Sequence, residues 1–197
     1  MMVYPHSLVT TYAPGVPVGK ALDIGAGRGD DSYYLAKELG FQVDVIDSKK
    51  EGMVHEKDEI LLELQKKAQE ESLSISTHEI DIRNFPLQKN TYSLIVAINS
   101  LQFLREDLAH VAPQLIDALV PGGRIIISMI TDMKRTDMPS TGLQDSSKKL
   151  FTKEYIAQLF SSLNSVLCEE RVIENAPHIG ADFPHTHTVI DFVGGKK

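Results

Sequence analysis

The sequence contains very little cysteine, because Cys168 is the only one among its 197 residues. A single thiol excludes an internal disulfide framework, and it excludes a metal site built from cysteine alone. The sequence also has no run of 18 apolar residues. It therefore predicts no membrane-spanning helix and no membrane partner.

Basic residues are fewer than acidic ones, with 20 Lys and Arg against 27 Asp and Glu, which gives a net charge of −7. A protein that neutralises many phosphates needs the opposite sign, so we expect no nucleic-acid partner. The first residues lack the basic region and the compact apolar stretch of a secretory signal. We therefore expect a cytoplasmic protein that is a monomer or a weak homodimer.

The composition is typical of a globular protein, with 42% apolar and 24% charged residues. At roughly 100–200 residues per domain, the length predicts a single domain over residues 1–197. A chain of this size can bury a sizeable core.

Short apolar runs alternate with helical periodicities along most of the chain. This alternation indicates an α/β fold with a doubly wound, mostly parallel sheet. Only a loop separates the last two predicted strands, which permits an antiparallel C-terminal strand. The seven predicted strands are 20–25, 41–47, 73–80, 92–98, 124–130, 165–174 and 185–193.

The segment 131–150 is polar and contains Pro139 and Gly142. It predicts a long loop after the fifth strand. Loops of this length are uncommon in compact domains and often cover active sites. We therefore expect 131–150 to be a lid.

A glycine-rich turn follows the first predicted strand, with Gly25, Gly27 and Gly29 at alternate positions. Glycine permits a sharp turn and a close approach of a ligand to the backbone. Asp47 lies twenty positions after Gly27, at the end of the second strand. A carboxylate at this spacing can accept hydrogen bonds from a ribose, so the pattern predicts a nucleoside site.

Two further carboxylates, Asp30 and Asp31, stand in the first turn of the helix after the glycines. They would repel a pyrophosphate that approached the same helix end. A dinucleotide fingerprint also needs a glycine or alanine where Asp30 stands. The pattern therefore favours a ligand with a ribose, a cationic group and no phosphate, such as S-adenosylmethionine.

Several segments carry a resemblance to a known family. LDIGAGRGDDSYYLAKELGFQVDVID (22–47) resembles motif I and the acidic strand end of the class I S-adenosylmethionine-dependent methyltransferases. The segments Asp81-Ile82, IVAINSLQFL (95–104) and LVPGGRIII (119–127) resemble later motifs of these enzymes, in the same order. The small size, Pro5-His6-Ser7 and the ending HTHTVIDFVGGKK resemble the small tellurite-resistance-type methyltransferases.

The resemblance implies a Rossmann-like methyltransferase fold and roles for individual residues. Asp81 would read the adenine. Asn99 would offer its backbone carbonyl to the amino group of the methionine moiety. The full set of residues implied to bind the cofactor is Asp23, Gly25, Ala26, Gly27, Gly29, Asp47, Ser48, Asp81, Ile82 and Asn99.

The histidines are the remaining candidates. His185 and His187 share one face of a predicted strand, and with His178 or Asp182 they could bind a metal ion. Histidines in a surface strand are usually not ligands, so we expect no metal site. His6 is the better candidate for the acceptor pocket by resemblance, and it would be the first candidate for a base if the acceptor were a hydroxyl or an amine.

We therefore expect a methyltransferase that uses S-adenosylmethionine and acts on a small-molecule acceptor such as a soft anion or a thiol. Two alternatives stay open at this point. One is an NAD(P)-binding oxidoreductase, although the sequence has no convincing Tyr-x-x-x-Lys pair. The other is a non-catalytic module that binds S-adenosylmethionine.

Overall fold

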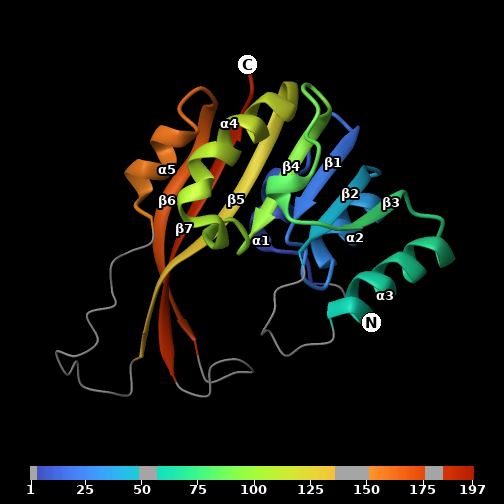
Figure 1. Cartoon of the computed structure of the whole chain (residues 1–197), viewed down its shortest axis with the longest axis horizontal. Helices are drawn as coiled ribbons and strands as arrows, with labels where there is room; N and C mark the ends of the chain where they lie inside the picture. Colours follow the sequence, from blue (N-terminus) through green and yellow to red (C-terminus); the bar gives the residue numbers. More distant parts are fainter. Residues whose placement is uncertain (1–3, 49–56, 136–150, 176–183) are drawn as a thin grey trace.

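A seven-stranded sheet forms the centre of the protein, seen in a computed structural model that describes residues 4–48, 57–135, 151–175 and 184–197 (Figure 1). Its strand order is β3-β2-β1-β4-β5-β7-β6. β7 runs antiparallel to both of its neighbours, while the other strands are parallel to one another. The strands are β1 (Lys20–Ile24), β2 (Gln42–Asp47), β3 (Ile75–Glu79), β4 (Tyr92–Ile98), β5 (Leu119–Arg135), β6 (Asn164–Asn175) and β7 (His185–Gly195). The predicted doubly wound fold with an antiparallel C-terminal strand is confirmed.

Helices cover both faces of the sheet (Figure 1). The helices α4 and α5 pack on one face, together with the short 3-10 helices η1 and η2. The helices α1, α2 and α3 pack on the other face. Their bounds are α1 (Ser7–Tyr12), α2 (Asp30–Lys37), α3 (Lys57–Glu70), η1 (Ile82–Asn84), η2 (Leu101–Asp107), α4 (Leu108–Ala118) and α5 (Lys153–Leu159). None of the helices in these parts of the chain is long and apolar enough to span a bilayer.

The central strand β4 shows why its sequence is apolar throughout. Ile95 and Ala97 belong to the core under α4 and α5, whereas Leu94 and Val96 belong to the core under α1 and α2. Successive side chains of a strand point to opposite faces. Both faces of this parallel strand are covered, so both sets of side chains are buried.

The predicted loop 131–150 is wrong at its beginning. Residues 131–135 continue β5. After a bulge at Thr131, residues 132–135 pair with β7 from Thr188 back to His185. This pairing satisfies backbone groups that a loop would leave to water, and a polar sequence does not prevent it. The rest of the predicted lid, 136–150, lies outside the described residues. Residues 49–56 also lie outside them, and α3 is observed from Lys57 onward.

Candidate functional site

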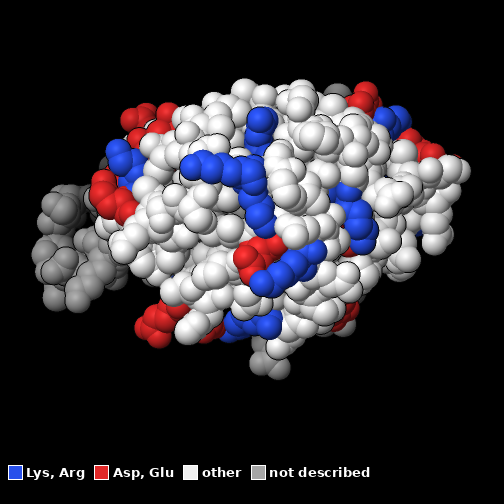
Figure 2. Space-filling model, turned by 90° about the horizontal axis from the view of Figure 1, so that it is seen from above, with Lys and Arg blue, Asp and Glu red and all other residues white. Residues whose placement is uncertain are grey.

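Three neighbouring cavities lie at the carboxyl ends of the parallel strands. The strand order reverses between β1 and β4, which is where ligands bind in open α/β sheets. Figure 2 shows the opposite end of the molecule, where the parallel strands begin, and basic and acidic side chains lie side by side there.

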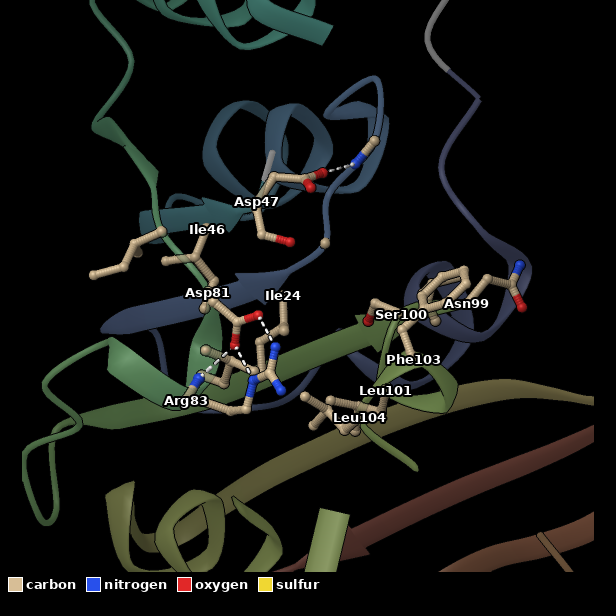
Figure 3. Close-up of a pocket in the computed structure, with 16 residues that line it drawn as sticks. Ile24, Ile46, Asp47, Asp81, Arg83, Asn99, Ser100, Leu101, Phe103 and Leu104 are labelled. Atoms are coloured by element: carbon tan, nitrogen blue, oxygen red, sulfur yellow. Dashed lines mark hydrogen bonds and ion pairs between the residues drawn. The ribbon is translucent and has the colours of Figure 1, made fainter. Parts of the chain in front are cut away.

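The first cavity, called here the central cavity, has a volume of about 330 Å³ (Figure 3). The segments that follow β1, β2, β3 and β4 build it. Its lining residues are Ile24, Gly25, Gly27, Ile46, Asp47, Ser48, Ile80, Asp81, Ile82, Arg83, Ile98, Asn99, Ser100, Leu101, Phe103 and Leu104. Apolar side chains therefore form most of the wall, and the polar part consists of two carboxylates, the guanidinium of Arg83, one amide and two hydroxyls.

The glycine turn closes one side of this cavity. Gly25 and Gly27 have φ angles of 70° and 54°, in the region that favours glycine. A Cβ atom on Gly25 would lie 2.5 Å from the Cβ of Ser100, so this glycine permits close packing of two loops. A Cβ atom on Gly27 would meet no atom within 4 Å. Gly27 therefore faces open space, as a position that a ligand approaches should.

Gly29, predicted as a third ligand contact, does not line the central cavity. A Cβ atom on Gly29 would lie 2.5 Å from Cδ2 of Leu64 on α3. The absence of a side chain here therefore serves the packing of the turn against α3. Ala26 lines the second cavity, described below.

The carboxylate of Asp47 lies beside the glycine turn. The backbone N–H of Gly27 donates a hydrogen bond to Oδ2 of Asp47 over 3.3 Å (Figure 3). The structure therefore brings together the two groups that the twenty-residue spacing predicts as a ribose site. Ser48 follows Asp47 in the wall of the same cavity.

Asp81 is engaged by a residue that sequence reasoning missed. Arg83 donates to Asp81 from its backbone N–H, from Nε and from a terminal nitrogen, over 2.8–2.9 Å (Figure 3). Its other terminal nitrogen donates to Asp107 over 2.8 Å. Arg83 thereby connects η1 to η2, the two short helices on one side of the central cavity. These ion pairs favour the charged guanidinium and raise the pKa of Arg83.

Asn99 follows directly after β4, with a left-handed φ of 51°. Its backbone N–H donates to the carbonyl of Ser128, and its own carbonyl accepts a hydrogen bond from Nε2 of Gln102 over 2.9 Å. The carbonyl that the resemblance implies for the methionine amino group therefore already has one donor. A carbonyl oxygen has two lone pairs, so a second donor can be accepted.

The second cavity, called here the acidic cavity, has a volume of about 240 Å³. It shares Gly25, Gly27 and Ile98 with the central cavity. Its full lining is Tyr4, His6, Asp23, Gly25, Ala26, Gly27, Arg28, Asp30, Asp31 and Ile98. Three carboxylates therefore lie next to the glycine turn. Arg28 pairs with Asp30 over 2.5 Å, so Asp23 and Asp31 are the carboxylates that give the cavity its acidic character.

Burial raises the pKa of Asp23 to about 7, and the nearby charges of Asp31 and Asp47 add to the effect. The hydroxyl of Ser32 donates to Oδ2 of Asp23 over 2.5 Å and acts in the opposite direction. Burial also raises the pKa of Asp31, against the backbone N–H of His6, which donates to Asp31 over 2.6 Å. A cation in this cavity would favour the charged carboxylates, because opposite charges at short range stabilise each other.

The third cavity, called here the ribbon cavity, has a volume of about 220 Å³ and lies along β5, β7 and β6. It shares His6 with the acidic cavity and Asn99 with the central cavity. Its lining residues are His6, Asn99, Ser128, Ile130, Arg171, Ile173, His187 and Val189. The three cavities therefore form one connected series.

Of the predicted histidines, His6 and His187 line the ribbon cavity. His185 is buried beside His187, with their Nε2 atoms 2.9 Å apart. No group of three or more metal-binding side chains occurs within the described ranges. His178 and Asp182, the other residues considered for a metal site, lie outside these ranges.

Arg171 and Phe103 were not found by sequence reasoning. Phe103 is half exposed at the central cavity, and it lies in a 3-10 helix whose apolar spacing reads as an ordinary helix face. Arg171 lies on β6. Successive side chains of a strand point to opposite faces, and this alternation could have predicted that Arg171 and Ile173 share one face.

Comparison with known proteins identifies the family. The methyltransferase domain family matches residues 21–123, just over half of the chain. No curated protein sequence matches the chain.

Solved structures share the fold over almost the entire chain. TehB from Haemophilus influenzae is 22% identical with a TM-score of 0.75, over 100% of this chain and 64% of TehB. Phosphoethanolamine N-methyltransferase 2 from Haemonchus contortus, in complex with S-adenosylmethionine, is 15% identical with a TM-score of 0.66, over 96% of this chain and 51% of that one. The 1,6-didemethyltoxoflavin-N1-methyltransferase from Burkholderia thailandensis is 16% identical with a TM-score of 0.62, over 96% of this chain and 76% of that one.

The chain thus spans less than two thirds of the length of the first two of these proteins. At these identities the structures show a common fold. The family match shows more, and it covers the glycine turn, Asp47 and Asp81. The chain therefore belongs to the methyltransferase domain family, and its resemblance to the class I S-adenosylmethionine-dependent methyltransferases is confirmed.

Proposed function

We propose that this protein transfers the methyl group of S-adenosylmethionine to a small-molecule acceptor that binds in the ribbon cavity. The observation that carries the proposal is the connected series of cavities, in which Gly27 faces open space between Asp47 and the three carboxylates. This arrangement suits a ligand with a nucleoside at one end and cationic groups at the other.

The residues fit the cofactor part by part. The apolar side chains of Ile82 and Leu104 line the central cavity and suit an adenine ring. Asp47, beside Gly27, is proposed to accept the ribose hydroxyls. The acidic cavity is proposed to hold the methionine end, whose ammonium group and neighbouring sulfonium are attracted by Asp23 and Asp31.

When bound, the cofactor supplies an activated methyl group on a cationic sulfur. The chain then has two tasks, to align the acceptor with this methyl group and to exclude water. Alignment of this kind can lower a barrier by roughly 7–11 kcal/mol. Asn99 and His6 are the residues proposed to border the point of transfer, since each lines the ribbon cavity and a cofactor cavity.

His6 is more suited to orient the acceptor than to take its proton. Its Nδ1 accepts the backbone N–H of Leu8 at the start of α1, over 3.4 Å. A neutral imidazole that accepts at Nδ1 carries its proton on Nε2. His6 therefore offers a donor in this tautomer, which suits an acceptor that is an anion or a thiolate.

Calorimetry with four ligands tests the proposal. We expect S-adenosylmethionine and S-adenosylhomocysteine to bind and NAD and NADP not to bind. A ligand at 100 times its dissociation constant should also raise the free energy of unfolding by about 2.7 kcal/mol. Binding of NAD alone, or of none of the four, would contradict the proposed cofactor.

Turnover separates the enzyme from a non-catalytic module that keeps the cofactor site. The protein is incubated with S-adenosylmethionine and a panel of small thiols and oxyanions, and formation of S-adenosylhomocysteine is measured. We expect at least one small acceptor to be methylated. A clear preference for tRNA or for protein over every small acceptor would contradict the acceptor class proposed here.

A further inference from the structure

The ribbon cavity extends across the sheet, away from the cofactor cavities. It begins at Asn99, which follows β4, and it ends at Arg171 on β6. The order β4-β5-β7-β6 separates these two strands by three steps of about 4.8 Å, or about 14 Å in all. A ligand that reaches both ends must therefore be longer than a single small ion.

The far end of the cavity carries a fixed positive group. Nε of Arg171 donates to Asp191, which also accepts the hydroxyl of Ser128 over 2.7 Å. Asp191 is 1% exposed and does not line the cavity, whereas the side chain of Arg171 is 37% exposed and does. The bond to Asp191 holds the guanidinium in one plane through Nε. Its terminal nitrogens remain as paired donors of the geometry that a carboxylate accepts.

The charge of this cavity is opposite to that of its neighbour. Asp23, Asp30 and Asp31 line the acidic cavity. Among the described residues that line the ribbon cavity there is no carboxylate, and Arg171 is the one side chain with a permanent charge. The sulfonium of a bound cofactor would add a second positive charge at the near end. Both ends of the ribbon cavity therefore favour an anion.

The middle of the cavity is apolar. Ile130 on β5, Val189 on β7 and Ile173 on β6 line it. Ile130 and Val189 are directly paired in the sheet, as are Val189 and Arg171, and Ile173 lies two positions after Arg171 on the same face of β6, so Ile130, Val189 and Ile173 form one apolar row that ends beside Arg171. An inorganic oxyanion would gain nothing from this row, whereas a short hydrocarbon would bury apolar surface on it.

We propose that the methyl acceptor is a small organic molecule with a terminal carboxylate that Arg171 binds. Its hydrocarbon part lies on the row of Ile130, Val189 and Ile173, and its nucleophilic atom lies at the end near Asn99 and His6. This inference rests on the proposed function and names the chemical class of its acceptor. Asp191 is a positioning residue in this arrangement, because it orients Arg171 and does not line the cavity.

The test uses two probes of equal length, 6-mercaptohexanoate and 6-mercaptohexan-1-ol, which are long enough to extend from the end near Asn99 towards Arg171, titrated by calorimetry into the protein saturated with S-adenosylhomocysteine. The wild type should bind the carboxylate at least tenfold more tightly than the alcohol. Arg171→Met should abolish this preference, and Arg171→Lys should retain part of it, because lysine keeps the charge and loses the planar fork. Lys89→Met serves as the matched control, since Lys89 pairs with Asp117 at a distance of 2.9 Å, away from the cavities.

Arg171→Met leaves the buried Asp191 without its cation and could prevent folding. The double variant Arg171→Met/Asp191→Asn removes both charges and should fold, bind S-adenosylhomocysteine as the wild type does, and show no preference for the carboxylate. A preference that survives in this variant overturns the proposal.

Three other results also overturn it: equal affinity of the wild type for both probes, no binding of either, or binding of sulfite as tight as that of 6-mercaptohexanoate. The last result would mean that the cavity takes an inorganic oxyanion. Failure of the wild type to bind S-adenosylhomocysteine would instead refute the proposed function itself, so the two failures are distinguishable.

Discussion

The two halves of the sheet carry cavities of opposite character. The half with β1, β2, β3 and β4 holds the central and acidic cavities, and the family match of residues 21–123 covers most of it. The half with β5, β7 and β6 holds most of the ribbon cavity, whose residues from Ser128 onward lie beyond that match. Methyltransferases that share the donor S-adenosylmethionine need a common site for it, whereas the acceptor differs from one enzyme to the next. Under the proposed function, the chemistry that distinguishes this protein from its relatives therefore lies in the second half.

The largest effect expected in the first half is that of Gly27→Val. The branched side chain would occupy the open space at Gly27, so we expect no detectable binding of S-adenosylhomocysteine by calorimetry. Gly15→Val is the matched control, because Gly15 also has a positive φ and no atom within 4 Å of its Cβ position. It should lose comparable stability and bind normally. Binding of S-adenosylhomocysteine by the Gly27 variant would show that the turn has only a structural role.

The acidic cavity should make the stability of the fold depend on pH. Asp23 has a folded pKa of about 7 against an ordinary value of 3.8. The folded protein therefore holds a proton that the unfolded chain releases at lower pH. This contribution to the free energy of unfolding is present below about pH 4 and is lost as the pH rises through 7.

Asp23→Asn should remove this contribution, which is a few kcal/mol between pH 4 and 7. Urea unfolding of both proteins at pH 4, 5, 6 and 7 measures it, and the variant should show the weaker decline. The free energy of unfolding of the variant should still decrease somewhat with pH, since the pKa of Asp31 is raised in the same direction. Parallel curves for the variant and the wild type would show that Asp23 is ionised in the free protein.

Asp47→Ala should weaken the binding of S-adenosylhomocysteine by about 1.5–3 kcal/mol, the value of hydrogen bonds to a charged group. The fold should survive, because Asp47 lies at the end of β2 and is not fully buried. Asp117→Ala, which removes an exposed carboxylate that pairs with Lys89, is the control. Equal affinity of the wild type and the Asp47 variant in calorimetry would refute the ribose assignment.

Ser128→Ala should have the smallest effect, and it tests whether the two halves of the sheet act separately. Its hydroxyl donates to the buried Asp191, so we expect a loss of about 1–2 kcal/mol in the free energy of unfolding. The affinity for S-adenosylhomocysteine should stay within twofold of the wild type. A large loss of cofactor affinity would mean that the two halves do not act separately.

The glycine turn and β4 were predictable because their signals are local. Gly25, Gly27 and Asp47 are related by strand–turn–helix geometry within 25 residues, and β4 lies at the centre of the sheet, so an unbroken apolar run reports burial on both faces. The start of the segment 131–150 was not predictable in this way. Its residues 131–135 are polar except for Met133, and only pairing with β7, fifty or more residues away, makes them a strand.

The sequence alone determined the fold class and the S-adenosylmethionine cofactor, and it placed the predicted nucleoside site at the glycine turn and Asp47, since each depends on periodicity or on groups that are close along the chain. Tertiary structure alone decided that Gly29 packs against Leu64, that Arg83 joins Asp81 to Asp107 and that Arg171 meets Asp191 at the end of the ribbon cavity. The physical reason is strand order. β6 and β7 reach the site only by adding to β5 at the edge of the sheet, and no periodicity records which strands become neighbours.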